Sequence, residues 1–323
     1  MRSSTFLAAI LIMLGCSEEF NPVVPGERPY VVFALMNTTI PAQIVRVHET
    51  SPPDEASPGN VSVPGASVLV TGPEGVVTFR DTLLTAPPGS GDTATVPAFV
   101  SDPFLPQRGQ TYTLNVLSPR GNATATTTIP GRGDITTNDF FVIRSPHSYP
   151  PERTINARAF LSPQALGYVV RFVVEYERMI PGEWITETVE VPRAYLSISD
   201  ANTFEAVYPK LIRRASAALT SFDGSQQVDG LNFGNRPYLQ TLSILYSRYG
   251  KENLRMKKAL LILTQAERHF FTYYSFANFF QDNLSIRVDR PDYTNIDGAL
   301  GFFGSIASDT VAYVLPPDLS APL

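Results

Sequence analysis

The fold is decided by the stretch Leu260-Leu261-Ile262-Leu263-Thr264-Gln265-Ala266-Glu267 and by the segment that continues from it to Gly304. The apolar run 260–263 is short enough to be a buried strand. Thr264 with Glu267 three residues later predicts a capping box, in which each side chain accepts a free backbone amide at the start of a helix. We therefore expect a helix over about 265–281.

The predicted helix is rich in aromatic side chains. One face at helical spacing is apolar, and Phe276 and Phe279 lie outside that face, so the helix should be covered on more than one side. Core packing accounts for these residues, and none of them requires chemistry. The residues of the main face are Ala266, Phe270, Tyr273, Ala277 and Phe280.

A glycine-punctuated stretch closes the decisive segment. It reads Asn295-Ile296-Asp297-Gly298-Ala299-Leu300-Gly301-Phe302-Phe303-Gly304 and predicts a turn followed by a strand. Asn295, Gly298, Gly301 and Gly304 are interpreted as structural turn residues, because glycine is the residue that adopts positive φ or permits close backbone approach.

Composition places the chain among extracytoplasmic β proteins. It has 323 residues, enough for one large domain or two, with 28 prolines and only 17% charged residues. The formal net charge of −5 argues against a nucleic-acid partner. With one cysteine, Cys16, and three separated histidines, neither an internal disulfide nor a usual zinc site is expected, and no cofactor is predicted.

The N-terminus predicts a lipoprotein signal peptide over residues 1–15. Arg2 supplies a minimal positive charge, and residues 6–14 form an apolar segment too short to span a bilayer. Met13-Leu14-Gly15-Cys16 resembles a bacterial lipobox, which implies cleavage before Cys16 and lipidation there. The alternative is an ordinary secretory signal with an incidental cysteine.

Residues 16–29 are then the lipidated N-terminus and a proline-containing tether. Ser17-Glu18-Glu19 resembles the export signal of surface lipoproteins in Bacteroidota. The expected location is the outer membrane, held through the lipid anchor, with the cell surface favoured over the periplasmic face.

Residues 30–131 predict a β-sandwich domain, immunoglobulin-like or carboxypeptidase-regulatory-like. Short strands alternate with turn signals, among them Gly72-Pro73-Glu74-Gly75. The proline- and glycine-rich residues 86–106 are expected to form a surface loop. The strand ranges are 30–36, 43–48, 66–71, 76–80, 111–117 and 122–129.

Residues 132–323 predict a β-rich domain with the one aromatic helix, so the whole chain is mainly β. Residues 168–177 alternate between apolar and mixed side chains, as an antiparallel strand does, and Pro181-Gly182 turns the chain into a second strand over 184–191. Further strands are expected over 194–199, 240–249 and 257–263, and a short helix over 211–219.

In this order, lipobox, sandwich, β domain, capped aromatic helix and glycine-rich strand, the chain resembles the Bacteroidota lipoprotein family labelled domain of unknown function 4249. Its C-terminal pattern, Asn-Ile-x-Gly-Gly-x-Gly-x-Phe-Gly, is similar to 295–304, with Ala299 in place of the second glycine. Gly65-Ala66-Ser67-Val68 and Gly109-Gln110-Thr111-Tyr112 also resemble its N-terminal module. The resemblance implies outer-membrane lipoproteins without an established activity, often associated with TonB-dependent transporters.

Candidate chemistry is sparse, and no catalytic residue is predicted. The chain contains no Gly-x-Ser-x-Gly elbow and no phosphate-binding glycine loop. Glu175, Glu177 and Glu187 are candidates for a glycosidase set across a hairpin, but glutamates on a solvent-facing sheet explain them better. The other candidates are His48, His147 and His269 as bases, and Asp289, Asp292, Asn295 and Asp297 as calcium ligands, for which turn capping is favoured.

Two functions are considered as hypotheses. The first is a non-enzymatic binding or accessory lipoprotein that works with a TonB-dependent transporter or another envelope protein. The alternative is an extracytoplasmic, glycan-directed hydrolase with carboxylates in an interdomain cleft. Three Asp-Thr pairs also resemble the O-glycosylation signal of exported Bacteroidota proteins, and loop position ranks Thr93 first, Thr82 second and Thr310 third.

Overall fold

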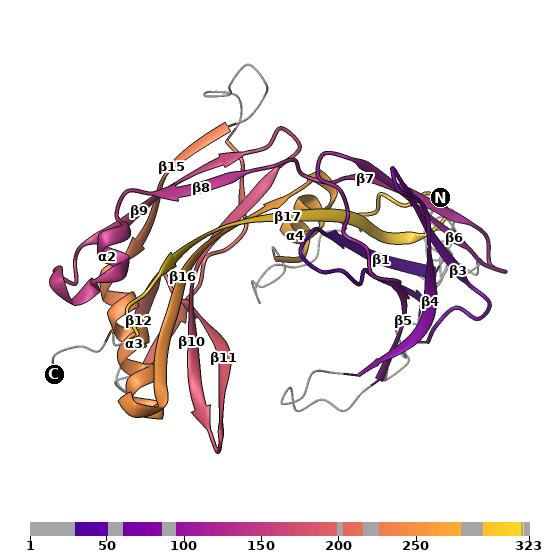
Figure 1. Cartoon of the computed structure of the whole chain (residues 1–323). Coiled ribbons are helices and arrows are strands. Elements are labelled where there is room, and N and C mark those ends of the chain that lie inside the picture. Colours follow the sequence, from indigo (N-terminus) through magenta and orange to yellow (C-terminus); the bar gives the residue numbers. More distant parts are fainter. Residues whose placement is uncertain are drawn as a thin grey trace, which may run out of the picture.

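A computed structural model describes residues 30–50, 61–85, 95–198, 203–215, 226–278, 293–317 and 319. The chain is mainly β, as predicted, and forms two lobes that are joined by one long strand (Figure 1). Each lobe encloses its own cluster of buried apolar side chains. None of the described helices is long and apolar enough to cross a membrane.

The first lobe is built from seven strands whose alternating side chains fill one core. In β1, residues 30, 32, 34 and 36 point inward and are almost fully buried, as the period of a strand requires. The expected loop 86–106 contains β5, and β4 continues well past residue 80, so both expectations are corrected. The strands are β1 Tyr30–Asn37, β2 Ile44–Glu49, β3 Ser67–Gly72, β4 Gly75–Thr85, β5 Thr95–Ser101, β6 Thr111–Leu117 and β7 Ala123–Thr128.

The second lobe packs a long hairpin against a small three-stranded sheet. The hairpin strands are β10 Gly167–Ile180 and β11 Glu183–Val191, and the small sheet has the order β15-β9-β8. The remaining strands are β8 Asp134–Thr137, β9 Thr154–Leu161, β12 Ala194–Ile198, β13 Thr203–Val207, β14 Ile212–Arg213, β15 Gln226–Gly234 and β16 Leu254–Ala266. The short helices are α2 Phe140–Arg144, η2 Pro146–Ser148 and η3 Lys251–Asn253.

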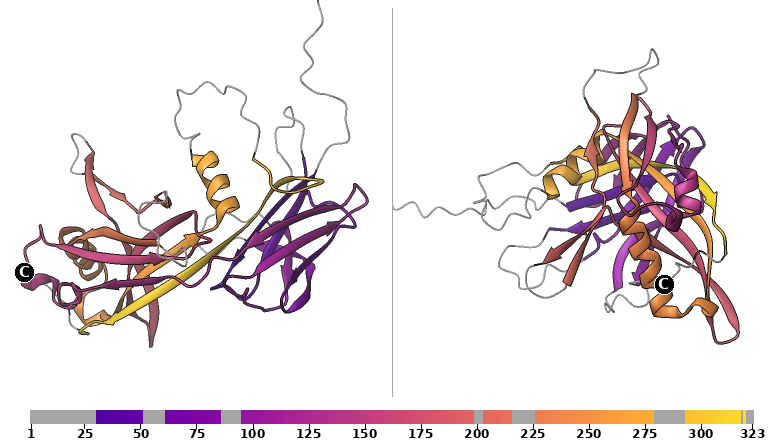
Figure 2. Two further views of the ribbon diagram at one scale, coloured as in Figure 1. Left: turned by 90° about the horizontal axis from the view of Figure 1, so that it is seen from above. Right: turned by 90° about the vertical axis from the view of Figure 1, so that its left-hand side faces the viewer.

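The last strand, β17 Leu300–Val314, belongs to both lobes. Its first half pairs in parallel with β1, and its second half pairs antiparallel with β16. As a result, twelve of the described strands join into one sheet that runs from β11 in the second lobe to β7 in the first, while β12 and β13 form a separate pair. Figure 2 shows β17 crossing from one lobe to the other. The division into 30–131 and 132–323 stays a prediction, while Ile296, Ala299 and Phe303 pack in the first core.

The predicted capping box at Thr264 is wrong by one turn of helix. Thr264 is still part of β16, and its hydroxyl bonds the Ser308 hydroxyl of β17 at 2.9 Å. The aromatic helix is α4 Arg268–Asn278, shorter than expected at its start, and its cap is Glu267 itself. The Glu267 carboxylate accepts the amides of His269 and Phe270, each at 2.7 Å, which completes the cap without the threonine.

The strand expected over 240–249 is also wrong, because α3 Asn235–Tyr249 occupies that range. Its buried residues Tyr238, Thr241, Leu242 and Leu245 follow helical spacing, and Pro237 lies in the first turn, where its missing amide costs nothing. In the region 211–219, the described part contains β14 and no helix, and the remainder lies outside the described residues.

Candidate functional site: the joint between the lobes

The motif 295–304 folds back on itself before it enters β17. The Asn295 side chain acts as a short strand, because its Nδ2 donates to the Phe303 carbonyl oxygen at 2.8 Å and its Oδ1 accepts the Phe303 amide at 2.9 Å. Two residues later, Asp297 exchanges both backbone hydrogen bonds with Thr124 of β7, each 2.9 Å long. The motif thereby attaches the last strand to the edge of the first lobe.

Gly298 and Gly301 have backbones that other residues rarely adopt, with φ of 85° and 105°. A side chain at either position would also collide with a backbone carbonyl oxygen, that of Asn122 for Gly298 and that of Val32 for Gly301. Gly304 allows a different approach: a Cβ atom there would lie 2.9 Å from both the Glu267 carboxylate and the Phe270 Cβ atom. The glycines of the motif hold three segments in close contact.

Glu267 connects α4 to β17 inside the protein. Glu267 is only 4% exposed. Besides capping α4, its carboxylate accepts a hydrogen bond from the Ser305 amide of β17 at 3.3 Å. Burial raises the pKa of Glu267, and the hydrogen bonds from His269, Phe270 and Ser305 oppose that shift only in part. The carboxyl group is therefore a buried polar connection between a helix and the shared strand.

Helix α4 rests on both lobes through aromatic rings. Phe271 is buried, and its ring fills the space beside Gly167 of β10, where a Cβ atom would collide with it. Tyr273 stacks on Phe302 of β17 with ring centroids 4.2 Å apart, and Phe33 of β1 meets both of these rings edge-on. The helix is therefore covered on two sides at these residues, while Phe276 and Phe279, on which the prediction rested, lie outside the side chains that the structure describes.

A polar cluster completes the joint on β17. The Asp309 carboxylate accepts Nη1 of Arg108 at 2.9 Å, the Gly133 amide at 3.0 Å and Nε2 of Gln265 at 3.3 Å. Gln265 is fully buried, and its Oε1 accepts the Ser162 amide at 2.7 Å. Arg108 comes from the first lobe and Ser162 from the second. The Asp309 carboxylate and the Gln265 side-chain amide therefore hold the segment around Gly133, between the lobes, against both of them.

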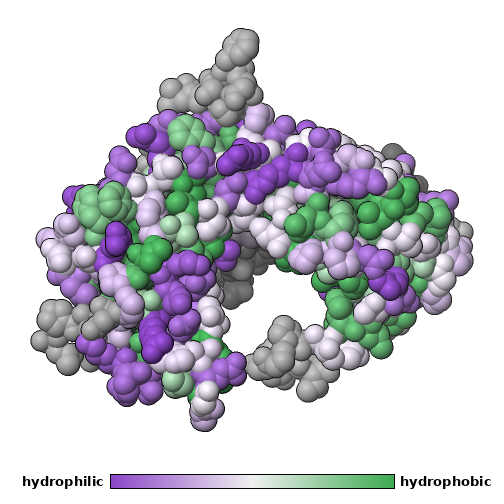
Figure 3. All heavy atoms as spheres, in the orientation of Figure 1, coloured by the Kyte–Doolittle hydropathy of each residue, from purple (hydrophilic) through white to green (hydrophobic). Residues whose placement is uncertain are grey.

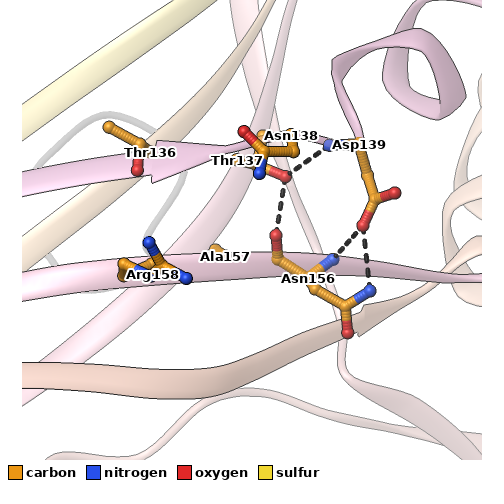
Figure 4. A pocket seen from close by; sticks show the side chains of 7 residues that line it. All are labelled: Thr136, Thr137, Asn138, Asp139, Asn156, Ala157 and Arg158. Atoms are coloured by element: carbon orange, nitrogen blue, oxygen red, sulfur yellow. Dashed lines mark hydrogen bonds between the residues drawn. The ribbon is translucent and has the colours of Figure 1, made fainter.

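A polar cavity of about 390 Å³ lies along β8 and β9 of the second lobe, and Figure 4 shows its side chains. Asp139 is nearly buried at one end, where it accepts Nη2 of Arg153 at 2.8 Å and the amide and side-chain nitrogens of Asn156, each at 2.9 Å. Most of the other lining residues carry hydroxyl, amide or guanidinium groups. These other residues are Thr136, Thr137, Asn138, Ala157 and Arg158.

The ionisation of Asp139 makes the stability of the fold depend on pH in the acidic range. Burial alone would raise the pKa of Asp139, but the hydrogen bonds from Asn156 and Arg153 outweigh burial and lower it. A carboxyl with a lowered folded-state pKa stabilises the fold above its ordinary pKa of about 3.9, and that stabilisation is lost as the pH falls through the folded-state value.

We expect Asp139→Asn to lower the free energy of unfolding at pH 7 by about 1–3 kcal/mol, since it removes a charged acceptor of three hydrogen bonds. The difference between variant and wild type should shrink below about pH 4. Urea unfolding of both proteins at several pH values measures it. A difference that stays constant down to pH 2 would contradict the assigned role, and Asn138→Asp, at an exposed neighbouring position, is the matched control.

The structure separates the three glutamates that were considered, and disfavoured, as a glycosidase set. In the β10–β11 register Glu187 lies opposite Tyr176, whereas Glu175 and Glu177 lie opposite Thr188 and Thr186 on the other face. The interpretation that all three carboxylates face one another is therefore wrong. Each of them is paired with a cation: Glu175 with Lys258 at 3.5 Å, Glu177 with Lys257 at 3.0 Å and Glu187 with Arg178 at 2.7 Å.

The three histidines are separated and have structural contacts. His48 of β2 lies beside the Phe33 ring. His147 lies in η2, where its Nε2 is 3.2 Å from the Leu319 carbonyl oxygen. His269 of α4 meets the Tyr293 hydroxyl at 2.6 Å, and burial lowers its pKa. Among the described residues, no group of three His, Cys, Asp or Glu side chains is arranged to hold a metal ion.

Only some of the modification residues belong to the described part of the chain. Cys16 and Thr93 lie outside the described residues, as do Asp289 and Asp292 of the calcium hypothesis. Thr82 is exposed in the middle of β4 rather than at a strand end. Thr310 is exposed in β17, and the preceding Asp309 is held in the joint.

The joint residues Arg108, Gln265 and Asp309 were missed from the sequence. Arg108 and Asp309 are separated by 201 positions, so no local pattern connects them. The available signal was weak: Gln265 follows the apolar run 260–263 within two residues, and a polar group in a buried strand needs a partner.

One family model matches most of this chain. It is described as Domain of unknown function (DUF4249) and covers residues 17–311, which include both lobes and the motif 295–304. No curated protein matches the chain.

Proposed function

The chain belongs to the family described as Domain of unknown function (DUF4249), and from that premise we propose that it is a non-enzymatic, lipid-anchored outer-membrane protein that binds an envelope partner. Its first expected partner is a TonB-dependent transporter. The anchor is lipid on Cys16, the source a Bacteroidota-like cell, and the cell surface is favoured over the periplasmic face. Glycosylation at Thr93, Thr82 and Thr310 belongs to the same proposal.

The proposal rests mainly on the structural role of the motif 295–304. Its asparagine and glycines hold β17 against β1, β7 and α4, so this stretch serves the joint between the lobes. Figure 3 shows an open hollow between the two lobes. Two lobes fixed in this way present preorganised surfaces to a partner, which reduces the entropic cost of binding.

The charges on the β10–β11 hairpin favour binding over hydrolysis. A glycosidase needs one carboxyl that is protonated near neutral pH and a second that is ionised. Here Glu175 and Glu177 each have a lysine within 3.5 Å, and for Glu187 the Arg178 guanidinium lowers the pKa of the carboxyl. Paired carboxylates of this kind suit an interface that recognises a partner by charge.

Cys16→Ala is expected to release the protein from membranes. The reason is that an acylated N-terminus is the only anchor predicted from the sequence, and it requires the cysteine sulfur. Fractionation of cells into membrane and soluble parts, followed by detection of a C-terminal tag, measures the effect. Ser17→Ala is the matched control and should stay with the membranes. Equal membrane fractions for Cys16→Ala and wild type would contradict the anchor.

The partner is tested by cross-linking in intact cells, followed by purification through the same tag and mass spectrometry. The proposal expects a TonB-dependent transporter or another envelope protein to be enriched at least tenfold over the Cys16→Ala variant. If the wild-type chain enriches no envelope protein over that variant, while purified protein cleaves a glycan panel, the hydrolase alternative replaces the proposal.

A further inference from the structure

A second cavity, of about 170 Å³, lies in the second lobe at the start of β10. Its walls are mostly apolar and come from β10 and β15, with Ile212 of β14 beside them. The register of β15 slips between Val228 and Leu231, and both residues line the cavity. A bulge of this kind re-aims side chains and is common beside binding sites. Val170 and Phe233 complete the apolar part.

One polar group is left without a partner in this wall. Tyr168 lines the cavity and is only 6% exposed, yet its hydroxyl makes no hydrogen bond to any described residue. Burial raises the pKa of Tyr168, so the group is a neutral donor at physiological pH. The hydroxyl oxygen is not fully shielded from solvent, and a ligand oxygen in the cavity would replace water as its hydrogen-bond partner.

Two cations stand at the same cavity. Arg193 and Lys210 are exposed lining residues, and neither forms an ion pair with a described side chain. Among the lining residues whose side chains the structure describes, none is a carboxylate, and Glu190, three residues before Arg193, is 3.8 Å from Arg171. Positive charge at the mouth of an apolar cavity favours an anion with an apolar body.

We propose that this cavity binds a small organic acid. Its carboxylate would lie between Arg193, Lys210 and the Tyr168 hydroxyl, and its apolar body would fill the space between Val170, Leu231 and Phe233. The cavity is smaller than the 300–1,000 Å³ typical of drug-sized ligands, so the body is short, comparable to hexanoate. The site is separate from the joint and does not depend on the membrane anchor.

The test is titration of the purified full chain with hexanoate, monitored by saturation-transfer NMR and calorimetry. Hexanol supplies the same body without the charge, acetate the charge without the body, and hexyl phosphate a lipid-like head. The double variant Arg193→Gln/Lys210→Gln removes the cations, and Tyr168→Phe removes only the hydroxyl. Arg213→Gln, at an exposed cation of β14 that is not a lining residue, is the matched control. Equal melting temperatures establish that all variants are folded.

The proposal expects hexanoate to bind at least tenfold more tightly than hexanol or acetate. The double variant should lose that advantage, Tyr168→Phe should weaken hexanoate severalfold, and Arg213→Gln should change nothing. Tighter binding of hexyl phosphate than of hexanoate would overturn the carboxylate assignment in favour of a phosphate headgroup. No binding, equal binding of hexanoate and hexanol, or full affinity in the double variant would overturn the site.

Discussion

Gly301→Val is expected to lower the free energy of unfolding by about 3 kcal/mol or more, the largest effect of any single change in the joint. Positive φ costs a β-branched residue about 1–3 kcal/mol, and overpacking adds a similar amount. Both costs apply here, because φ is 105° and a Cβ atom would collide with the Val32 carbonyl oxygen of the neighbouring strand. Urea unfolding monitored by circular dichroism measures the loss.

Gly182→Val is the matched control for backbone strain. Gly182 also has positive φ, 89°, but a Cβ atom there would meet no atom within 4 Å. The control should therefore lose only the part of the stability that arises from positive φ. The additional loss of stability at Gly301 then measures the effect of the close contact between β17 and β1. Equal losses at the two positions would show that close approach at Gly301 contributes nothing to stability.

Glu267→Ala is the second large change, with an expected loss of about 2–4 kcal/mol. Removal of a helix cap, which here includes the bond from the Phe270 amide, costs about 1 kcal/mol, and the one further amide left without an acceptor costs about 1–3 kcal/mol more. The amides of Phe270 and Ser305 both depend on this carboxylate. Hydrogen exchange of these amides, together with urea unfolding, measures the effect.

Glu267→Gln distinguishes hydrogen bonding from charge. The amide oxygen keeps one acceptor and removes the buried charge, so its loss should be less than half that of Glu267→Ala. Because burial raises the pKa of Glu267, the wild type should gain stability as the pH falls through that pKa, and the glutamine variant should not. If glutamine is as destabilising as alanine at pH 7, the ionised carboxylate itself stabilises the joint.

The strands of this protein were readable from the sequence where one face is buried. Alternation in residues 168–177 predicted β10, and Gly72-Pro73-Glu74-Gly75 predicted the β3–β4 hairpin, because both signals are local. The stretch 240–249 failed because its run of leucine, isoleucine and tyrosine suits a strand, while the decisive Pro237 and Tyr238 lie just before it. The capping box failed because Thr264 continues the pairing of β16 with β17.

The joint was predictable only in part. Positive φ at Gly298 and Gly301 follows from glycine spacing, but the partners of those glycines, Asn122 and Val32, lie far away in the sequence, in the first lobe. The ion pair of Arg108 with Asp309 likewise joins two residues that lie far apart in the sequence. Contacts of this kind depend on β17 crossing between lobes, and a single sequence contains no local signal for a crossing strand.

The central claim is that β17 and its contacts fix the two lobes as one body. Pulsed electron spin resonance between labels at Thr78→Cys in β4 and Thr186→Cys in β11 tests it, in a chain that also carries Cys16→Ala, because both threonines are exposed and lie in different lobes. We expect one narrow distance distribution that broadens in Gly301→Val. A broad or two-peaked distribution in the chain with intact Gly301 would contradict the claim.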